Sequence, residues 1–157
     1  MIKIRKILCP VDFLPGSDHA VIYATGLAGA HNAKVYLLHV IAPVISGPYA
    51  DGISTVDVTE SLEHAAIREM TRLVAKVKAR GIKAQGSVMH GQIKDVISRV
   101  IAELKPDLIT MGTHNRSSIE RWFMGSVTEW LIRHSPVPVL VVAPKSVKKA
   151  RITKRAA

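Results

Sequence analysis

The chain of 157 residues is long enough for one domain, and its 48 % of hydrophobic residues exclude an intrinsically disordered protein. No segment approaches the ~20 consecutive apolar residues of a membrane span, so we expect a soluble, cytoplasmic protein. The net charge of +10 is concentrated in residues 145–157, which hold six basic and no acidic side chains; residues 1–144 contain 16 basic and 12 acidic residues. We therefore expect a domain over residues 1–144 and a solvated basic tail over residues 145–157.

Five short apolar segments predict β-strands. They are residues 6–11 (KILCPV), 34–40 (KVYLLHV), 84–89 (AQGSVM), 107–111 (DLITM) and 138–142 (PVLVV). Continuous apolar runs of this length are typical of strands covered on both faces, as in a parallel sheet. The third segment has the weakest pattern because Gly86 and Ser87 interrupt it. Cys9 lies in the first segment, and we interpret it as a small buried hydrophobic residue.

Helical patterns occupy the intervals between these strands. The expected helices cover about residues 17–32, 59–81, 92–104 and 126–135. Ser17 is expected to cap the first helix, and Thr59 or Ser61 to start the second, which Gly81 ends in a left-handed conformation. Strands and helices thus alternate along the chain. This alternation predicts a doubly wound α/β domain with right-handed crossovers.

The connection over residues 41–58 is long and has no convincing period. A connection of this length inside a compact domain is usually functional or mobile. Two interpretations remain open, a flap over a ligand and a variable surface excursion.

The segment MGTHNRSSIERWFMGSVTE, residues 111–129, follows the fourth predicted strand. Gly112 lets the backbone approach a ligand closely or adopt a positive φ, and Asn115 tolerates left-handed geometry. Gly125 and Ser126 then open a helix whose free N–H groups and hydroxyl form an anion site. The spacing of Ser126 and Glu129 is equally that of a capping box, so phosphate binding and simple capping both remain open. A similar box at residues 117–120 predicts a short helical turn over residues 119–124.

Several other kinds of site are not favoured. The P-loop and the G-x-G-x-x-G fingerprint are absent from the sequence. A hydrolase triad of Ser126, His114 and Asp12 would lack the G-x-S-x-G elbow. His39, His90 and His114 fall near strand ends but lack the spacing of a zinc site, so no protein-ligated metal is expected. Nucleic-acid binding is unlikely on this sequence, because no helix-turn-helix, zinc-finger or aromatic-basic pattern accompanies the tail.

Taken together, these segments resemble the universal stress protein family. Its signature G-x2-G-x9-G-[ST] reads here as Gly112, Asn115, Gly125 and Ser126, with Asn115 in place of the second glycine. The resemblance covers about residues 3–143 and includes KILCPVDFLPGSDHA at residues 6–20 and the KVYLLHV strand. It implies a Rossmann-like, five-stranded parallel sheet of strand order 3-2-1-4-5 with an adenine-nucleotide site.

The resemblance also implies where a nucleotide binds. Pro10, Val11 and Asp12 would lie near the adenosine, and Val40 at the adenine edge. The ribose and phosphates would be held by residues of the signature segment, namely Met111, Gly112, Asn115, Gly125, Ser126, Val127 and Thr128. ATP is the expected ligand, with Mg²⁺ carried by its phosphates and with AMP and cyclic AMP as alternatives.

Three functions follow from this resemblance. The favoured one is an ATP-binding stress-response or signalling protein. The alternatives are a slow ATPase that uses the same pocket and an interaction protein whose pocket is empty. In the implied strand order the fifth strand lies at an edge of the sheet, and a homodimer paired through this strand would cover it.

Overall fold

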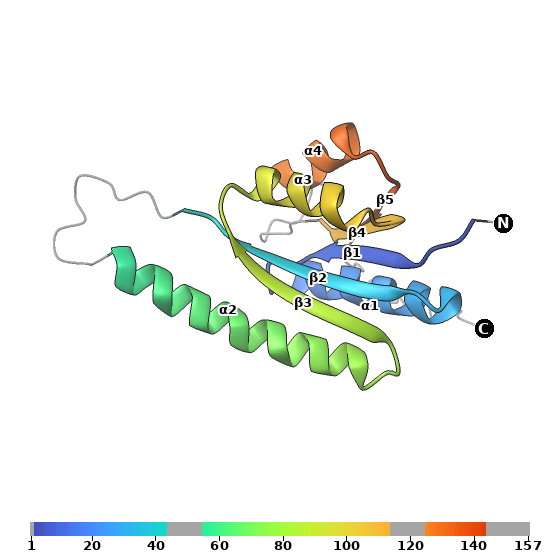
Figure 1. Ribbon diagram of the computed structural model, residues 1–157, viewed down its shortest axis with the longest axis horizontal. Coiled ribbons are helices and arrows are strands. Elements are labelled where there is room, and N and C mark those ends of the chain that lie inside the picture. The colour runs from blue at the N-terminus through green and yellow to red at the C-terminus, as the bar shows by residue number, and fades with distance from the viewer. Residues whose placement is uncertain (1, 44–54, 114–124, 144–157) are drawn as a thin grey trace, which may run out of the picture.

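The computed structural model describes residues 2–43, 55–113 and 125–143, which form an α/β structure in three layers (Figure 1). The strands are β1 (Lys6–Pro10), β2 (Lys34–Ile41), β3 (Lys83–His90), β4 (Leu108–Gly112) and β5 (Val139–Val142). The helices are α1 (Pro15–His31), α2 (Thr55–Lys78), α3 (Ile93–Leu104) and α4 (Ser126–His134). Every strand begins and ends within one residue of its predicted segment.

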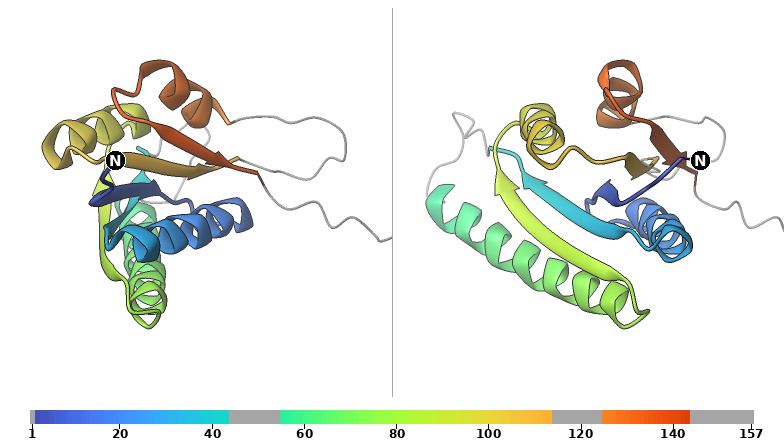
Figure 2. Two further views of the ribbon diagram at one scale, coloured as in Figure 1. Left: turned by 90° about the vertical axis from the view of Figure 1, so that its right-hand side faces the viewer. Right: turned by 45° about the vertical axis from the view of Figure 1, so that its right-hand side comes forward.

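All five strands are parallel, and their order in the sheet is β3-β2-β1-β4-β5. The predicted doubly wound fold and strand order are therefore confirmed. Helices α1 and α2 cover one face of the sheet, and α3 and α4 cover the other (Figures 1 and 2). The chain leaves β1 and β4 toward opposite faces, so a crevice is expected at the carboxyl ends of these two strands.

The hydrophobic core consists of one cluster on each face of the sheet. Successive side chains of β1 alternate between them: Ile7 and Cys9 join the α1–α2 side, and Leu8 joins the α3–α4 side. Cys9 is fully buried, and burial raises the pKa of its thiol to about 12. The thiol therefore stays protonated at neutral pH, which confirms the interpretation of Cys9 as a core residue.

Gly86, which weakened the prediction of β3, has a packing role. A Cβ atom at this position would lie 2.5 Å from Met70 Sδ and 2.7 Å from Val74 Cγ2. Both side chains belong to α2 and pack in the core on this face of the sheet. The missing side chain thus lets α2 lie close against β3.

The start of α1 differs from its prediction. The helix begins at Pro15, its N-cap is Leu14, and no side chain caps it. The Ser17 hydroxyl, expected to be the cap, instead donates a hydrogen bond to the Leu14 carbonyl at 2.9 Å. Proline is favoured in the first turn because its φ is already helical and its missing N–H would have no helical acceptor. The prediction that Ser17 caps this helix was therefore wrong, because the N-cap is Leu14, three residues earlier.

The second helix is longer than its prediction. It begins at Thr55, before the expected start at Thr59 or Ser61, so the long connection after β2 is shorter than expected. Residues 44–54 of that connection, like the turn predicted at residues 119–124, lie outside the described residues. Gly81 follows α2 with a φ of 77°, as expected for a left-handed helix end. Within the described ranges, no helix is both long and apolar enough to cross a membrane.

Asp107 fixes β4 beside β1. Its carboxylate accepts hydrogen bonds from the N–H groups of Arg5 at 2.7 Å and Lys6 at 2.9 Å. These two bonds hold the pKa of Asp107 below its ordinary value, because they stabilise the ionised form. The Lys6 ammonium in turn donates to the Leu104 carbonyl at the end of α3. The contacts anchor the amino end of β4, whose carboxyl end enters the candidate site.

Candidate functional site

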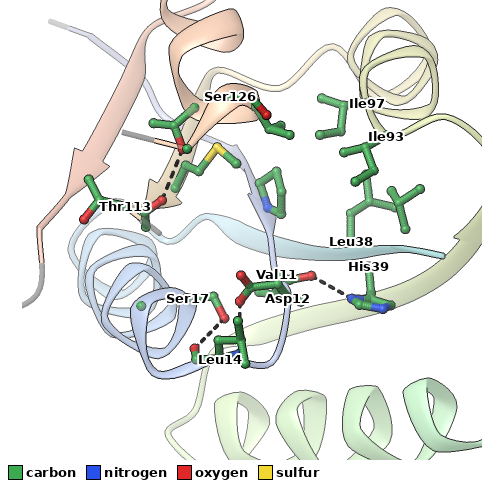
Figure 3. A pocket seen from close by; sticks show the side chains of 18 of the residues that line it. Val11, Asp12, Leu14, Ser17, Leu38, His39, Ile93, Ile97, Thr113 and Ser126 are labelled. Carbon is green, nitrogen blue, oxygen red and sulfur yellow. Dashed lines mark hydrogen bonds between the residues drawn. The ribbon is translucent and has the colours of Figure 1, made fainter. Parts of the chain in front are cut away.

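A pocket of about 490 Å³ lies at the carboxyl end of the sheet, within the size range of ordinary small-molecule sites (Figure 3). The ends of β1, β2 and β4 and the starts of α1, α3 and α4 line it. In Figure 3, Leu38, Ile93 and Ile97 form an apolar group on one side, and Ser17 and Thr113 lie on the other. One side of the pocket therefore suits a flat apolar group, and the other offers polar atoms.

The residues predicted from the sequence gather around this pocket. Those that line it are Pro10, Val11, Asp12, Val40, Met111, Gly112, Gly125, Ser126, Val127 and Thr128. Asn115 lies outside the described residues. Their contact with a ligand remains a prediction, but their convergence from four separate segments of the chain is a property of the fold.

The pocket also has lining residues that sequence reasoning missed. They are Leu14, Pro15, Gly16, Ser17, Leu38, His39, Ile93, Ile97 and Thr113. Ile93 and Ile97 are one helical turn apart, which is also the pattern of an ordinary core-facing helix. Nothing in that pattern distinguishes a pocket wall from a core position. The stretch from Leu14 to Ser17 begins two residues after Asp12. Its position just after the end of a strand could have indicated that it lines the pocket.

The turn from β1 into α1 has an unusual backbone. Phe13 has a φ of 59°, which is uncommon for a residue with a bulky side chain. Asp12 Oδ1 accepts a hydrogen bond from the Leu14 N–H at 2.9 Å, and the Val11 N–H donates to the Leu38 carbonyl at 2.8 Å. These bonds hold the turn tightly against β2. Backbone strain of this kind persists only where surrounding contacts enforce it, and it is concentrated at functional sites.

The start of α4 offers backbone donors to the pocket. Gly125 is the N-cap and supplies no side-chain hydrogen bond; the first helical bond runs from the Glu129 N–H to the Gly125 carbonyl. The N–H groups of Ser126, Val127 and Thr128 therefore have no acceptor within the helix. Unbonded amides at the positive end of a helix form a favourable position for an anion.

The predicted capping box at this helix does not form. Ser126 is the first helical residue, not the N-cap, and its side chain is exposed. The Glu129 carboxylate pairs with Arg133 at 3.0 Å, one turn further along α4. The alternative that Ser126 merely caps its own helix is therefore wrong, and its hydroxyl is not committed to a capping bond.

Thr128 plays a different role from its neighbours. It is 2 % exposed, and its hydroxyl donates to the Gly112 carbonyl at 3.3 Å. This bond joins the first turn of α4 to the end of β4. A role in fixing the two sides of the pocket fits Thr128 better than direct ligand contact through its side chain.

Gly112 is explained by packing between two main chains. Its φ is not positive, and an added Cβ would overlap the Gly16 carbonyl oxygen. A Cβ at Gly16 would likewise lie 2.6 Å from the Thr113 carbonyl oxygen. The two glycines let the start of α1 cross close to the end of β4. Of the two roles expected for Gly112, a positive φ is not found, and a close approach to a ligand stays a prediction. The close approach that the structure does show is made by α1.

The histidines expected near strand ends do not meet. The His39 ring lies beside the pocket, where its Nδ1 is 2.8 Å from the Val11 carbonyl oxygen. His90 Nε2 lies 3.2 Å from a Glu63 carboxylate oxygen of α2. His114 lies outside the described residues. Among the residues that the structure describes, no three His, Cys, Asp or Glu side chains are grouped to hold a metal ion.

Val40 presents its backbone to the pocket. The N–H and C=O of one strand residue point to the same side, and neighbouring residues alternate between sides. Lys34 and Leu38 bond toward β1, through Arg5 and Val11, whereas Ile41 bonds toward β3. The N–H and C=O of Val40 therefore face the β1 side, where the chain has turned away into α1. A donor and an acceptor lie side by side at this edge of the pocket.

Comparisons with known proteins agree with this geometry. A model of the universal stress protein family matches residues 3–143. A universal stress protein of Staphylococcus aureus (strain USA300) is 31 % identical over 144 residues, which cover 90 % of this chain and 86 % of that protein.

Three solved structures share the fold. The universal stress protein UspA from Lactobacillus plantarum has a TM-score of 0.76 at 23 % identity and covers 89 % of this chain and 98 % of its own. A family member from Arabidopsis thaliana with AMP bound has a TM-score of 0.68 at 18 % identity, over 90 % and 93 % of the two chains. A universal stress protein in complex with cAMP has a TM-score of 0.66 at 23 % identity, over 88 % and 97 %. From the family match and the Staphylococcus relative, this chain belongs to the universal stress protein family.

Proposed function

We propose that this protein binds ATP in the pocket at the carboxyl end of its sheet and acts as a nucleotide-dependent stress-response or signalling protein. One observation carries the proposal. The pocket combines the backbone donor and acceptor of Val40 with the amides at the start of α4 that have no acceptor within the helix, and Val40 packs against the apolar cluster that contains Leu38 and Ile97. The N–H and C=O of Val40 could pair with the hydrogen-bonding edge of a nucleobase. The amides of α4 could donate hydrogen bonds to phosphate oxygens.

The remaining lining residues fit an adenine nucleotide. Ile93 and Ile97 line the pocket and would provide an apolar surface for a flat base. Asp12 lines the same pocket and would accept hydrogen bonds from ribose hydroxyls. Structures of family members with AMP and with cAMP support an adenine nucleotide over other ligands. Mg²⁺ would enter with the phosphates, since it commonly keeps its waters and takes few protein ligands.

Binding, not catalysis, is the proposed role. The titratable side chains described around the pocket, Asp12 and His39, already bond to the main chain through Oδ1 and Nδ1. The sequence also lacks the P-loop lysine that would stabilise charge on a transferred phosphate. We expect turnover of ATP far below the ~10 s⁻¹ of an ordinary enzyme. A change of stability or of protein partner on ATP binding is therefore the proposed output.

Calorimetry with ATP and Mg²⁺ tests this function. Gly125→Val places a branched side chain at the N-cap beside the α4 amides, and we expect it to weaken ATP binding at least about tenfold. Ser126→Ala should cost less, because the backbone donors remain. Gly26→Val is the matched control, since its added side chain meets open space on α1 away from the pocket. A folded wild type that binds no ATP would favour an interaction protein with an empty pocket.

We also propose that the protein forms a homodimer through β5, an edge strand of the sheet. Ile109 and Thr113 of the β4 side donate to the carbonyls of Pro138 and Val142. By alternation, Val139 and Val141 turn their backbone groups away from β4, toward the open edge. The β5 strand of a second copy could satisfy these groups about a two-fold axis.

A further inference from the structure

The pairing between β1 and β2 stops beside His39, where one expected backbone hydrogen bond is not formed. Paired residues run from Lys6 with Lys34 to Pro10 with Leu38, and the Val11 N–H adds one more bond to the Leu38 carbonyl. In a regular parallel ladder the next bond would run from the Val40 N–H to the Val11 carbonyl. Among the described residues, no such backbone bond is formed.

The Val11 carbonyl is bonded to a side chain in its place. His39 Nδ1 lies 2.8 Å from this oxygen, as Figure 3 shows. A carbonyl oxygen can only accept a hydrogen bond, so Nδ1 carries the hydrogen. The imidazole thus bonds to the oxygen that the Val40 N–H would reach in a regular ladder, and the Val40 N–H, which makes no backbone bond to it, is left facing the pocket.

Phe13 keeps the imidazole in this position. The Phe13 and His39 ring centroids are 4.4 Å apart with an interplanar angle of 31°. Phe13 is also the residue with the left-handed φ of 59° that turns the chain away from β2. The strained turn and the ring contact therefore act together. The turn at Phe13 leads the chain after β1 away from Val40. The Phe13 ring holds the imidazole of His39 in its bond to the Val11 carbonyl.

We propose that His39 is a positioning residue for base recognition, which ends the β1–β2 ladder one bond early so that Val40 can read a nucleobase. This inference rests on the proposed nucleotide-binding function and deepens it. Val40 then offers an N–H donor beside a C=O acceptor. Adenine has the complementary edge, with N1 as acceptor and the exocyclic amine as donor. Hypoxanthine has the opposite arrangement, with N1–H as donor and the 6-oxo group as acceptor.

The test compares ATP with inosine triphosphate, which differs from ATP only at this edge of the base. His39→Leu removes the donor at similar size and frees the Val11 carbonyl for Val40. We expect the preference for ATP over inosine triphosphate to fall about tenfold, through weaker ATP binding, while the affinity for inosine triphosphate changes less than about twofold. His39→Asn places an amide N–H near the position of Nδ1 and should restore the preference.

The control is His134→Leu, since His134 also bonds through Nδ1 to a carbonyl at 2.8 Å but lies at the far end of α4. It should leave both affinities unchanged. An equal loss of both nucleotides in His39→Leu would indicate a merely structural histidine and overturn the proposal. Failure of His39→Asn to restore the preference would also overturn it.

A measurement without ligand separates this inference from the proposed function. Amide hydrogen exchange by NMR should show a rapidly exchanging Val40 N–H in the wild type and at least about tenfold slower exchange in His39→Leu, where it can bond to Val11. The Leu38 N–H, which lies inside the ladder, should stay protected in both proteins and report an intact sheet. A protected Val40 N–H in the ligand-free wild type would overturn the inference. A wild type that binds neither nucleotide would contradict only the proposed function.

Discussion

Thr110 is a buried polar residue whose hydroxyl has no hydrogen-bond partner among the described residues. It is 0 % exposed and lies in the middle of β4, beneath the end of the strand that enters the pocket. A buried polar group without a partner costs about 1–3 kcal/mol of desolvation. The middle of β4 thus contains a local destabilisation that an apolar side chain of the same shape would remove.

Thr110→Val is therefore expected to stabilise the fold. The substitution keeps the shape of the side chain and removes the unsatisfied hydroxyl, so the melting temperature should rise by about 2–4 °C for about 1 kcal/mol. Thr128→Val is the matched control, because Thr128 is equally buried but donates to the Gly112 carbonyl. It should lower the melting temperature. Thermal unfolding followed by circular dichroism checks both changes, and a loss of stability in Thr110→Val would show that its hydroxyl has a partner.

At the scale of elements, the pocket depends on how closely α1 approaches β4. Gly16 and Gly112 face one another there with no room for a Cβ on either. Both contacts are with main-chain atoms, which cannot swing aside as a long side chain can. The two glycines therefore set the distance between the first turn of α1 and the strand end from which the signature segment departs.

Gly16→Ala tests this close approach. The added methyl would meet the Thr113 carbonyl at 2.6 Å, and we expect a loss of about 1–3 kcal/mol from overpacking, together with weaker ATP binding. Gly29→Ala is the control, since its Cβ would meet only the end of the Ile82 side chain at 3.4 Å, and alanine is the better helix former. Chemical denaturation measures the loss. Equal stability of Gly16→Ala and the wild type would show that α1 can shift without cost.

The elements also show what the sequence could and could not predict. The positions of the strands could be predicted from the five apolar runs. The order of the strands could be predicted from the family resemblance, which extends over nearly the whole chain. Helix caps were less accurate than helix spans: Ser17 and Ser126 are suitable caps by type, but Leu14 and Gly125 are the actual N-caps. The packing of Gly112 against Gly16 could not be predicted, since the two residues are distant in the chain. The sequence placed His39 near a strand end, but the role proposed for it depends on a missing backbone bond that only the register of β1 and β2 reveals.

At the scale of the whole molecule, β5 forms one edge of the sheet, and in the described part of the chain it pairs only with β4. A β-strand edge with unpaired backbone groups invites association, and proteins usually cover it or interrupt it. Pro138, just before β5, does not interrupt this edge, because its carbonyl accepts from the Ile109 N–H and its backbone groups therefore face β4. Val141 lies further along, with its backbone turned outward by the alternation described above. Its side chain belongs to neither of the two core clusters, so it can be changed with little effect on packing.

Val141→Pro should convert the proposed dimer into a monomer. Proline removes the outward N–H that pairing with a second β5 would use, and an edge strand tolerates it where the N–H faces solvent. We therefore expect a monomeric mass by light scattering at micromolar concentration and a fold that remains intact by circular dichroism. Val141→Thr keeps the N–H and the β-branched shape, so it should remain dimeric. A monomeric wild type under the same conditions would remove the proposed interface, and a dimeric Val141→Pro protein would place it elsewhere on the surface.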